Sequence, residues 1–521
     1  MRRRQFLGAI GGLSVLPGAA FANKDSASKQ DRSTQSSTGQ TLLLVDDHHI
    51  FYRSGTKRIL HPLTRHPGNP LIQGRQQPWE TAIAWNSVYR NPVTGLYQLW
   101  YQAFAGDAAR ERTHRCTVCY AESQDGITWT KPNLGLHSFN GIKETNIVLL
   151  ANGGTSDRYG ASVIFDPLDH DSARRYKMVY FDFTKDSHGH DEPGLTVAFS
   201  PDGIHWTKYP RAPLLSASYG TIGETVPFRS EPGRGWTRPL SVADAQDVFY
   251  DPKNRAFVCY GKMWIDGPDG KMFWKHAMGR TQSPDFIHWS RPQLVLTPDD
   301  VDPSYVEFHT VPVFFHQDCY FACPQILNRA ERGGIMDIEL AFSRDGFHWE
   351  RPFRHPFFLA RNTAGQFDSG SLFTNSTPVF LENEIRFYYG GYSDGATGGD
   401  DYNMGSGIGL ATIPRDRFAG IRPQEKLGQV TLKPIDFKKC ETLLLNADAK
   451  SGAVWCEVLE ADGFRVRGFT REDAVPISGD SLRHPVRWKE KSLSQLPPGS
   501  YLLRFHLENS EIFAVSMSNQ A

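Results

Sequence analysis

The chain has 521 residues, with 57 basic and 57 acidic side chains and therefore no formal net charge. This balance disfavours a general nucleic-acid binder, which normally carries a basic excess. Only 22% of residues are charged and 12% are aromatic, with 47 Gly and 33 Pro, a composition that excludes a disordered chain or a coiled coil and favours short strands joined by turns.

The N-terminus has the pattern of an export signal. Residues 1–22 combine three arginines with a short apolar run that ends in Ala-Phe-Ala. The run is too short to span a bilayer, and its end is typical of a cleavage site. Arg3-Arg4 and the residues after it resemble the twin-arginine signal, with an ordinary secretory signal as the alternative. We therefore expect a periplasmic or secreted protein, in which residues 23–40 are a polar, Ser-rich linker.

One pattern, Ser-x-Asp-Gly/Phe-x-x-Trp, recurs four times through the middle of the chain. The copies begin at Ser123, Ser200, Ser283 and Ser343, and strand-like segments separated by Asn-Pro or Asp-Pro turns precede the first three. Four close copies indicate a repeat architecture. With a degenerate fifth copy, units of four strands each predict a five-bladed β-propeller over residues 41–425.

The repeated motif, called the box below, is predicted to be structural. It falls at the hairpin between the third and fourth strands of each blade, where its Asp can accept hydrogen bonds from the turn N–H groups. Its Gly allows the turn geometry, and its Trp is expected to pack between blades. Asp125 and Asp202 are therefore not chosen as catalytic residues, although they recur.

Residues 426–521 lack the box. Their segments alternate or run apolar, and Asp-Gly and Pro-Gly pairs supply turns. We predict a C-terminal β-sandwich, so the whole chain is expected to be all-β.

Acidic residues precede the predicted innermost strand of each blade. They are Glu80, Asp157, Asp244, Glu307 and Asp368. Converging at a central funnel, several like charges would raise some pKa values and leave others low, the division that carboxylate-based glycoside cleavage needs. An acid before a strand can instead be a turn or cap residue, and Asp247 can point between strands.

The repeats, the acids at strand starts and the trailing sandwich resemble the five-bladed propeller glycoside hydrolases. That superfamily (families 32, 43 and 117) includes arabinanases, xylosidases, invertases, levansucrases and anhydrogalactosidases. The box is also similar to the Asp-box of sialidases, which have six blades. The resemblance implies a base or nucleophile, a carboxylate that tunes a pKa and a general acid on successive blades. By position, Asp244 and Glu307 are the best pair, followed by Glu80 and Asp368. Trp79-Glu80 stands in place of the invertase signature, which argues against sucrose or fructan.

The predicted substrate-binding residues are His309, Asp157, Trp79, Arg112, His188 and His276. His309 follows Glu307 by two residues, and anhydrogalactosidase relatives use a His as acid; a packed core histidine is the alternative. Basic and His-rich loops suit an anionic sugar, with a solvated loop surface as the alternative. No metal or other cofactor is expected to be required, and a structural Ca²⁺ is allowed.

These features predict an exported glycoside hydrolase that acts from the ends of oligosaccharides derived from a plant or marine polysaccharide, with inversion preferred. We expect no nucleic-acid partner and no membrane association after signal removal. Two alternatives stay open. A polysaccharide lyase would use a Tyr or His base with an Arg or Lys that neutralises a uronate. A non-catalytic propeller would bind carbohydrate without cleaving it.

Overall fold

The computed structural model describes residues 39–153, 160–185, 191–216, 244–265, 275–331, 333–396, 404–437 and 440–518, all within the unit Ser37–Ala521. In these ranges the regular structure consists of β-strands and short 3₁₀ turns, without an α-helix. The all-β prediction is therefore confirmed. None of these residues forms a helix long and apolar enough to cross a membrane. The predicted export signal lies outside the described residues.

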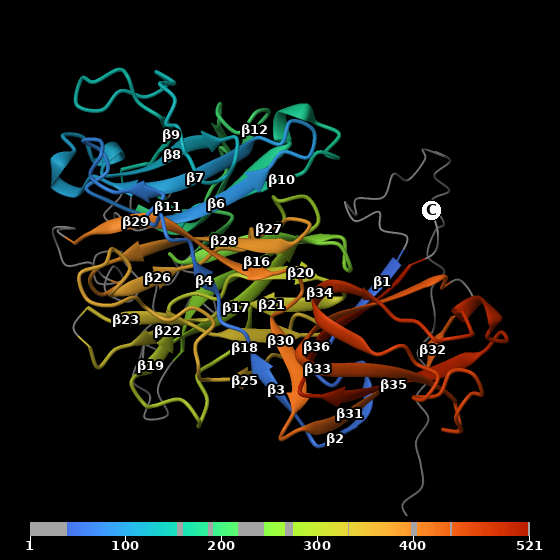
Figure 1. Cartoon of the computed structure of the whole chain (residues 1–521). Helices are drawn as coiled ribbons and strands as arrows, with labels where there is room; N and C mark the ends of the chain where they lie inside the picture. The colour runs from blue at the N-terminus through green and yellow to red at the C-terminus, as the bar shows by residue number, and fades with distance from the viewer. Residues whose placement is uncertain are drawn as a thin grey trace, which may run out of the picture. The chain divides into compact units, whose positions relative to one another are not determined.

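The C-terminal region forms a ten-stranded sheet to which the beginning of the described chain contributes three strands. β1 pairs with β36, β2 with β31 and β3 with β30, so blue strands lie among orange and red ones in Figure 1. The strands are β1 (Gly39–Leu43), β2 (Ile50–Ser54), β3 (Thr56–Leu60), β30 (Ala419–Pro423), β31 (Leu427–Leu432), β32 (Ile435–Asp436), β33 (Thr442–Glu460), β34 (Ile477–Pro485), β35 (Ser500–Glu508) and β36 (Glu511–Ser518).

The predicted domain boundaries at residues 41 and 425 do not coincide with the limits of this sheet. Residues 39–60 and 419–423 were predicted within or just before the propeller, yet their strands belong to the C-terminal sheet. The reason is burial, because Leu42, Leu44 and Ile50 share an apolar core with the C-terminal strands. Strand pairing across most of the chain length leaves no local signal in the sequence.

The longest strand, β33, changes partner along its length. Its first half pairs with β36 and its second half with β35. Leu445 from the first half and Val458 from the second are both fully buried in the same core. The segment predicted as a sandwich is thus one continuous hydrogen-bonded sheet whose two halves enclose a common core.

The rest of the described chain forms five antiparallel repeats. The first sheet contains β6 (Ala82–Arg90), β7 (Tyr97–Phe104), β8 (Cys116–Ser123) and β9 (Ile147–Leu150). The second contains β10 (Ser162–Phe165), β11 (Tyr176–Lys185), β12 (Asp191–Ser200), β13 (Thr207–Lys208) and β14 (Leu215–Ser216). The third contains β15 (Gln246–Asp251), β16 (Ala256–Ile265), β17 (Lys275–Ser283) and β18 (Gln293–Leu296).

The fourth repeat is split along its strands into two hydrogen-bonded parts, and the fifth uses strands from the start of the chain. The fourth comprises β19 (Val306–Phe308), β22 (Gln325–Asn328) and β23 (Ile335–Ile338), followed by β20 (Val313–His316), β21 (Cys319–Ala322), β24 (Leu340–Ser343) and β25 (Glu350–Phe353). The fifth comprises β26 (Ser371–Phe373), β27 (Val379–Phe380), β28 (Glu384–Tyr392) and β29 (Ser406–Pro414), with β4 (Thr64–Arg65) and β5 (Ile72–Gln73) on its outer edge. Within the described ranges, four 3₁₀ turns complete the elements: Gly106–Ala108, Arg112–His114, Ser172–Arg174 and Leu493–Gln495.

The five sheets follow one another around a closed ring. β6 contacts β10, β10 contacts β15, β15 contacts β20, β23 contacts β26, and β28 returns to β6. Because β4 and β5 complete the fifth sheet, the beginning of the chain joins the end of the ring. This order is the one that the predicted propeller requires.

Hydrogen bonds from small polar side chains link the innermost strands. Ser87 accepts from the N–H of Val163 at 2.9 Å, and Ser162 accepts from that of Val248 at 3.1 Å. On the other side of the ring, Thr377 accepts from the N–H of Val88 at 3.0 Å. Side chains of one sheet therefore satisfy backbone groups of the next, which fixes the sheets to one another.

The boxes have the structural role predicted for them. Asp125 accepts from the N–H groups of Ile127 and Thr128, both at 2.7 Å, and the other three boxes repeat this turn. The box of one sheet also docks on its neighbour: the indole of Trp100 donates to the carbonyl of Gly203 at 2.6 Å. Among the box tryptophans, Trp129 packs on Tyr388 of the fifth sheet at 5.7 Å and Trp349 packs on Tyr260 of the third at 5.8 Å, as predicted.

Candidate active site

A buried ion pair lies at one edge of the third sheet. Asp244 stands two residues before β15 and Lys262 lies near the end of the antiparallel β16, so both reach the same edge. The Lys262 Nζ is 2.5 Å from Oδ1 of Asp244, and both side chains are less than a tenth exposed. Lys262 was missed by sequence reasoning, although a lysine inside the apolar segment Ala256–Ile265 was a signal for a buried partner.

A second buried carboxylate, Glu307, lies at the start of the fourth sheet on β19. Its Oε2 is 2.7 Å from Nδ1 of His276 on β17 and accepts the His276 backbone N–H at 3.1 Å. Nε of Arg329 is 3.6 Å from its other oxygen. Burial opposes ionisation of Glu307, but the His276 contacts and the Arg329 charge outweigh it and lower the pKa of Glu307.

Two histidines beside these carboxylates are held neutral. Burial, followed by the charge of Lys262, lowers the pKa of His276 to about 4 and that of His309 to about 3. Nδ1 of His309 is 3.2 Å from the side-chain oxygen of Gln325. Its ring lies 5.8 Å from those of Trp85 and Phe373 in the first and fifth sheets.

These five residues form one group, called the acid–histidine cluster: Asp244, Lys262, His276, Glu307 and His309. Lys262 is two residues from Trp264 on β16, and Trp264 lies opposite His276 with the two ring centroids 3.8 Å apart. The charge of Lys262 lowers the pKa of both histidines. The structure thus brings together four residues that the sequence singled out from separate segments. Their catalytic and binding roles stay predictions.

Glu80 and Asp368 lie in other surroundings. Glu80 is fully buried, accepts from the hydroxyl of Tyr101 at 2.5 Å and pairs with Lys131 at 2.7 Å. Asp368 is equally buried and pairs with Arg65 at 2.8 Å. The expected convergence of one carboxylate per blade does not hold for these two, because their side chains turn to cations in the outer parts of their sheets.

The remaining predicted residues are placed as follows. Trp79 is 2% exposed, packs on Phe139 and donates its indole N–H to Asn146 at 3.1 Å, so it belongs to the core of the first sheet. Arg112 is exposed in a 3₁₀ turn. Asp157 and His188 lie outside the described residues.

Asp247, left ambiguous by the sequence, points between strands. It accepts from the hydroxyl of Ser162 at 2.8 Å and from the N–H of Ser376 at 3.1 Å, and so joins the third sheet to the second and fifth. Burial raises its pKa to about 7. Asp247 is therefore one of the side chains whose hydrogen bonds link the innermost strands.

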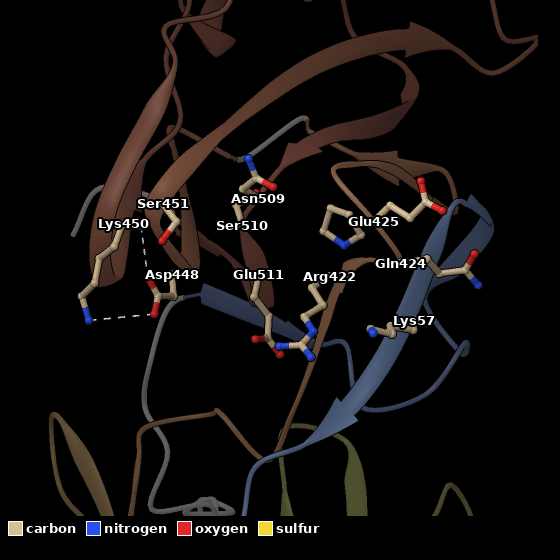
Figure 2. A pocket seen from close by; sticks show the side chains of 11 residues that line it. Lys57, Arg422, Gln424, Glu425, Asp448, Lys450, Ser451, Asn509, Ser510 and Glu511 are labelled. Carbon is tan, nitrogen blue, oxygen red and sulfur yellow. Dashed lines mark hydrogen bonds and ion pairs between the residues drawn. The ribbon is translucent and has the colours of Figure 1, made fainter.

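The described residues hold no group of three or more His, Cys, Asp or Glu side chains arranged for a metal ion. Whether the chain needs a cofactor or carries a structural Ca²⁺ stays a prediction. A cavity of about 410 Å³ opens on the C-terminal sheet, lined by residues such as Arg422, Lys450 and Glu511 (Figure 2). No residue of the acid–histidine cluster lines it.

No protein-family model matches the chain, and no curated protein resembles it in sequence. Solved structures resemble it distantly. An N-acetylgalactosamine deacetylase from F. plautii, in complex with blood group B trisaccharide, is 17% identical, with a TM-score of 0.43 over 68% of this chain and 96% of that one. A glycosyl hydrolase from Bacteroides ovatus is 15% identical, with a TM-score of 0.43 over 68% and 94%. A thermostable family-43 glycoside hydrolase is 15% identical, with a TM-score of 0.41 over 67% and 91%. At these values the likenesses assign no activity.

Proposed function

We propose that this chain is an exported glycoside hydrolase, that its five sheets are the blades of a β-propeller, and that the acid–histidine cluster is its active site. The observation that carries the proposal is the presence of two buried carboxylates at the edges of neighbouring sheets. Asp244 contacts Lys262, whereas Glu307 contacts His276. Glycoside cleavage needs two carboxyl groups held in different environments.

The partners suggest how the two carboxylates divide the work. Glu307, whose pKa is lowered, is suited to act in its ionised form as base or nucleophile. Asp244 supplies the second carboxyl, and Lys262 fixes its position. The contacts of His309 with the first and fifth sheets support a site at the centre of the ring, where a chain end would enter, and so support exo action on oligosaccharides.

The histidines favour a hydrolase over the lyase alternative. A lyase needs a base that removes a carbon-bound proton, and such a base works best with a pKa near the operating pH. Imidazoles with pKa values of about 3 and 4 are weak bases. They are better suited to hydrogen bonding with sugar hydroxyls. A lyase would reveal itself by an unsaturated product that absorbs ultraviolet light.

The test is hydrolysis of a panel of plant and algal oligosaccharides, scored by the release of reducing ends. We expect Asp244→Asn and Glu307→Gln each to lower kcat by about 10²–10⁴-fold without loss of folding. Glu350→Gln, at an exposed position on β25 in the other part of the fourth repeat, is the control. Wild-type activity in both site variants would show that the site is wrong, and sugar binding without turnover would favour the non-catalytic alternative.

A further inference from the structure

Trp85 is an extra residue in the innermost strand of the first sheet. In the register of β6 against β7, Ala84 lies opposite Gln102 and Asn86 opposite Tyr101, which leaves Trp85 without a partner across the ladder. Such a bulge bends the strand and redirects the side chain of the inserted residue. Bulges of this kind are frequent beside active sites. The bulge therefore makes the side chain of Trp85 a candidate for a functional role.

The Trp85 ring contacts residues from several sheets. Its centroid is 4.6 Å from that of Phe373 in the fifth sheet and 5.8 Å from that of His309 in the fourth. A Cβ placed on Gly160, before the second sheet, would lie 3.5 Å from Cδ1 of Trp85 and 3.4 Å from the backbone oxygen of Asp244. The bulge thus carries the indole to the place where the sheets converge, beside the acid–histidine cluster.

The indole is incompletely satisfied where it lies. The residue is partly exposed, yet its Nε1 is buried and has no hydrogen-bond partner among the described residues. A buried indole N–H normally finds an acceptor, and leaving it unpaired costs free energy. Because the N–H group is covered, the exposed part of the Trp85 side chain is the part that a ligand can contact.

We infer that Trp85 is the platform on which a sugar ring packs while its glycosidic bond faces Asp244 and Glu307, an inference that rests on the proposed function. A pyranose presents C–H groups on its faces, and these pack on an indole by dispersion and by removal of apolar surface from water. The ligand class is a pyranoside with one face free of charged substituents, because an ionic group held against the indole would lose hydration without a partner.

The test is titration with methyl β-D-glucopyranoside, methyl β-D-galactopyranoside and methyl α-D-mannopyranoside, followed by tryptophan fluorescence and by calorimetry. At least one should bind the wild type and change its fluorescence. Trp85→Ala should raise Kd about tenfold or more, as truncation of a buried aromatic anchor does. Trp85→Phe keeps a smaller aromatic ring and should lie between the two. With a cleaved substrate, KM should rise more than kcat falls.

Trp129→Phe is the matched control, because the Nε1 of Trp129 also lacks a partner but its ring packs in a box hairpin against Tyr388. It should leave Kd unchanged. Binding by Trp85→Ala or Trp85→Phe as tight as wild type, or no binding of any glycoside by the wild type, would overturn the platform. Weakened binding with no hydrolysis in any variant would support the platform and reject the hydrolase, so the two proposals fail separately.

Discussion

Glu80 and Asp368 occupy equivalent positions in the first and fifth sheets, each accepting a hydrogen bond from a tyrosine on the second strand of its own sheet. Tyr101 donates to Glu80 at 2.5 Å and Tyr389 donates to Asp368 at 2.8 Å. The repeated position thus serves a repeated structural task, in which a buried acid joins the entry of the inner strand to the sheet.

The equivalence extends to the partners of these tyrosines. Asn146 donates to the hydroxyl of Tyr101 at 2.8 Å, and Asn69 donates to that of Tyr389 at 3.2 Å. A cation completes each group, Lys131 in one and Arg65 in the other. Each acid is thus held by a tyrosine and a cation, although Oδ1 of Asp368 has no hydrogen-bond partner among the described residues, and removing one member leaves the others unpaired.

Lys131→Met should therefore destabilise the fold without changing kcat. It leaves Glu80 buried beside Tyr101 without a cation, which costs about 3–5 kcal/mol of the free energy of unfolding. Urea denaturation measures that loss, and kcat of the folded enzyme should stay at the wild-type value. Lys143→Met, at an exposed lysine, is the control. A variant with full stability and lost turnover would instead place Glu80 in the chemistry.

Gly203→Ala should lower the free energy of unfolding by disturbing the contact between the first and second sheets. Gly203 has a φ of +81°, and a Cβ there would lie 2.6 Å from the Trp100 ring. The left-handed backbone alone costs about 1–3 kcal/mol for a residue with a side chain, and the clash adds to it. Gly365→Ala isolates the backbone contribution, because its φ is +91° and nothing lies within 4 Å of the new Cβ. Equal losses in urea denaturation would show that the docking of the box on Trp100 contributes nothing.

His309 should make stability fall in acid. Burial lowers its pKa to about 3 from an ordinary value of 6.5, so below pH 6.5 the unfolded chain binds a proton that the folded chain rejects. The free energy of unfolding then falls as the pH drops from about 6.5 to about 3, by on the order of 5 kcal/mol from this residue. His309→Gln should flatten that dependence in denaturation curves at a series of pH values. His170→Gln, at an exposed histidine, should leave the slope as it is.

Asp247 should act in the opposite direction. Its pKa is raised from 3.8 to about 7 by burial, so between these values the folded chain keeps a proton that the unfolded chain has lost. Stability from this group is complete below about pH 4 and is lost as the pH rises to about 7. Asp247→Asn should match the wild type near pH 4 and exceed it at pH 8 by on the order of 4 kcal/mol. A variant less stable than wild type at every pH would mean that the carboxylate itself is needed by Ser162 and Ser376.

The sequence predicted best what depends on local spacing. Four boxes with the same residues at the same offsets can only be four similar turns, since Asp, Gly and Ser act on backbone groups two or three residues away. The all-β character and the repeat therefore followed from the chain alone. The positions of Asp244 and Glu307 before or at the start of inner strands also followed from the chain, whereas their choice as the catalytic pair came from the family resemblance and stays a prediction.

The tertiary structure decided where side chains with identical local signals point. Glu80 and Asp368 precede inner strands just as Asp244 and Glu307 do, but Lys131 and Arg65, supplied by other segments, bury them. Trp85 was not recognised, because a bulge is a mismatch between two strands and neither strand shows it alone. Hydrogen bonding within a turn is determined by neighbours in sequence, whereas the partner of a buried charge or an inserted residue is determined by chain segments that only folding brings together.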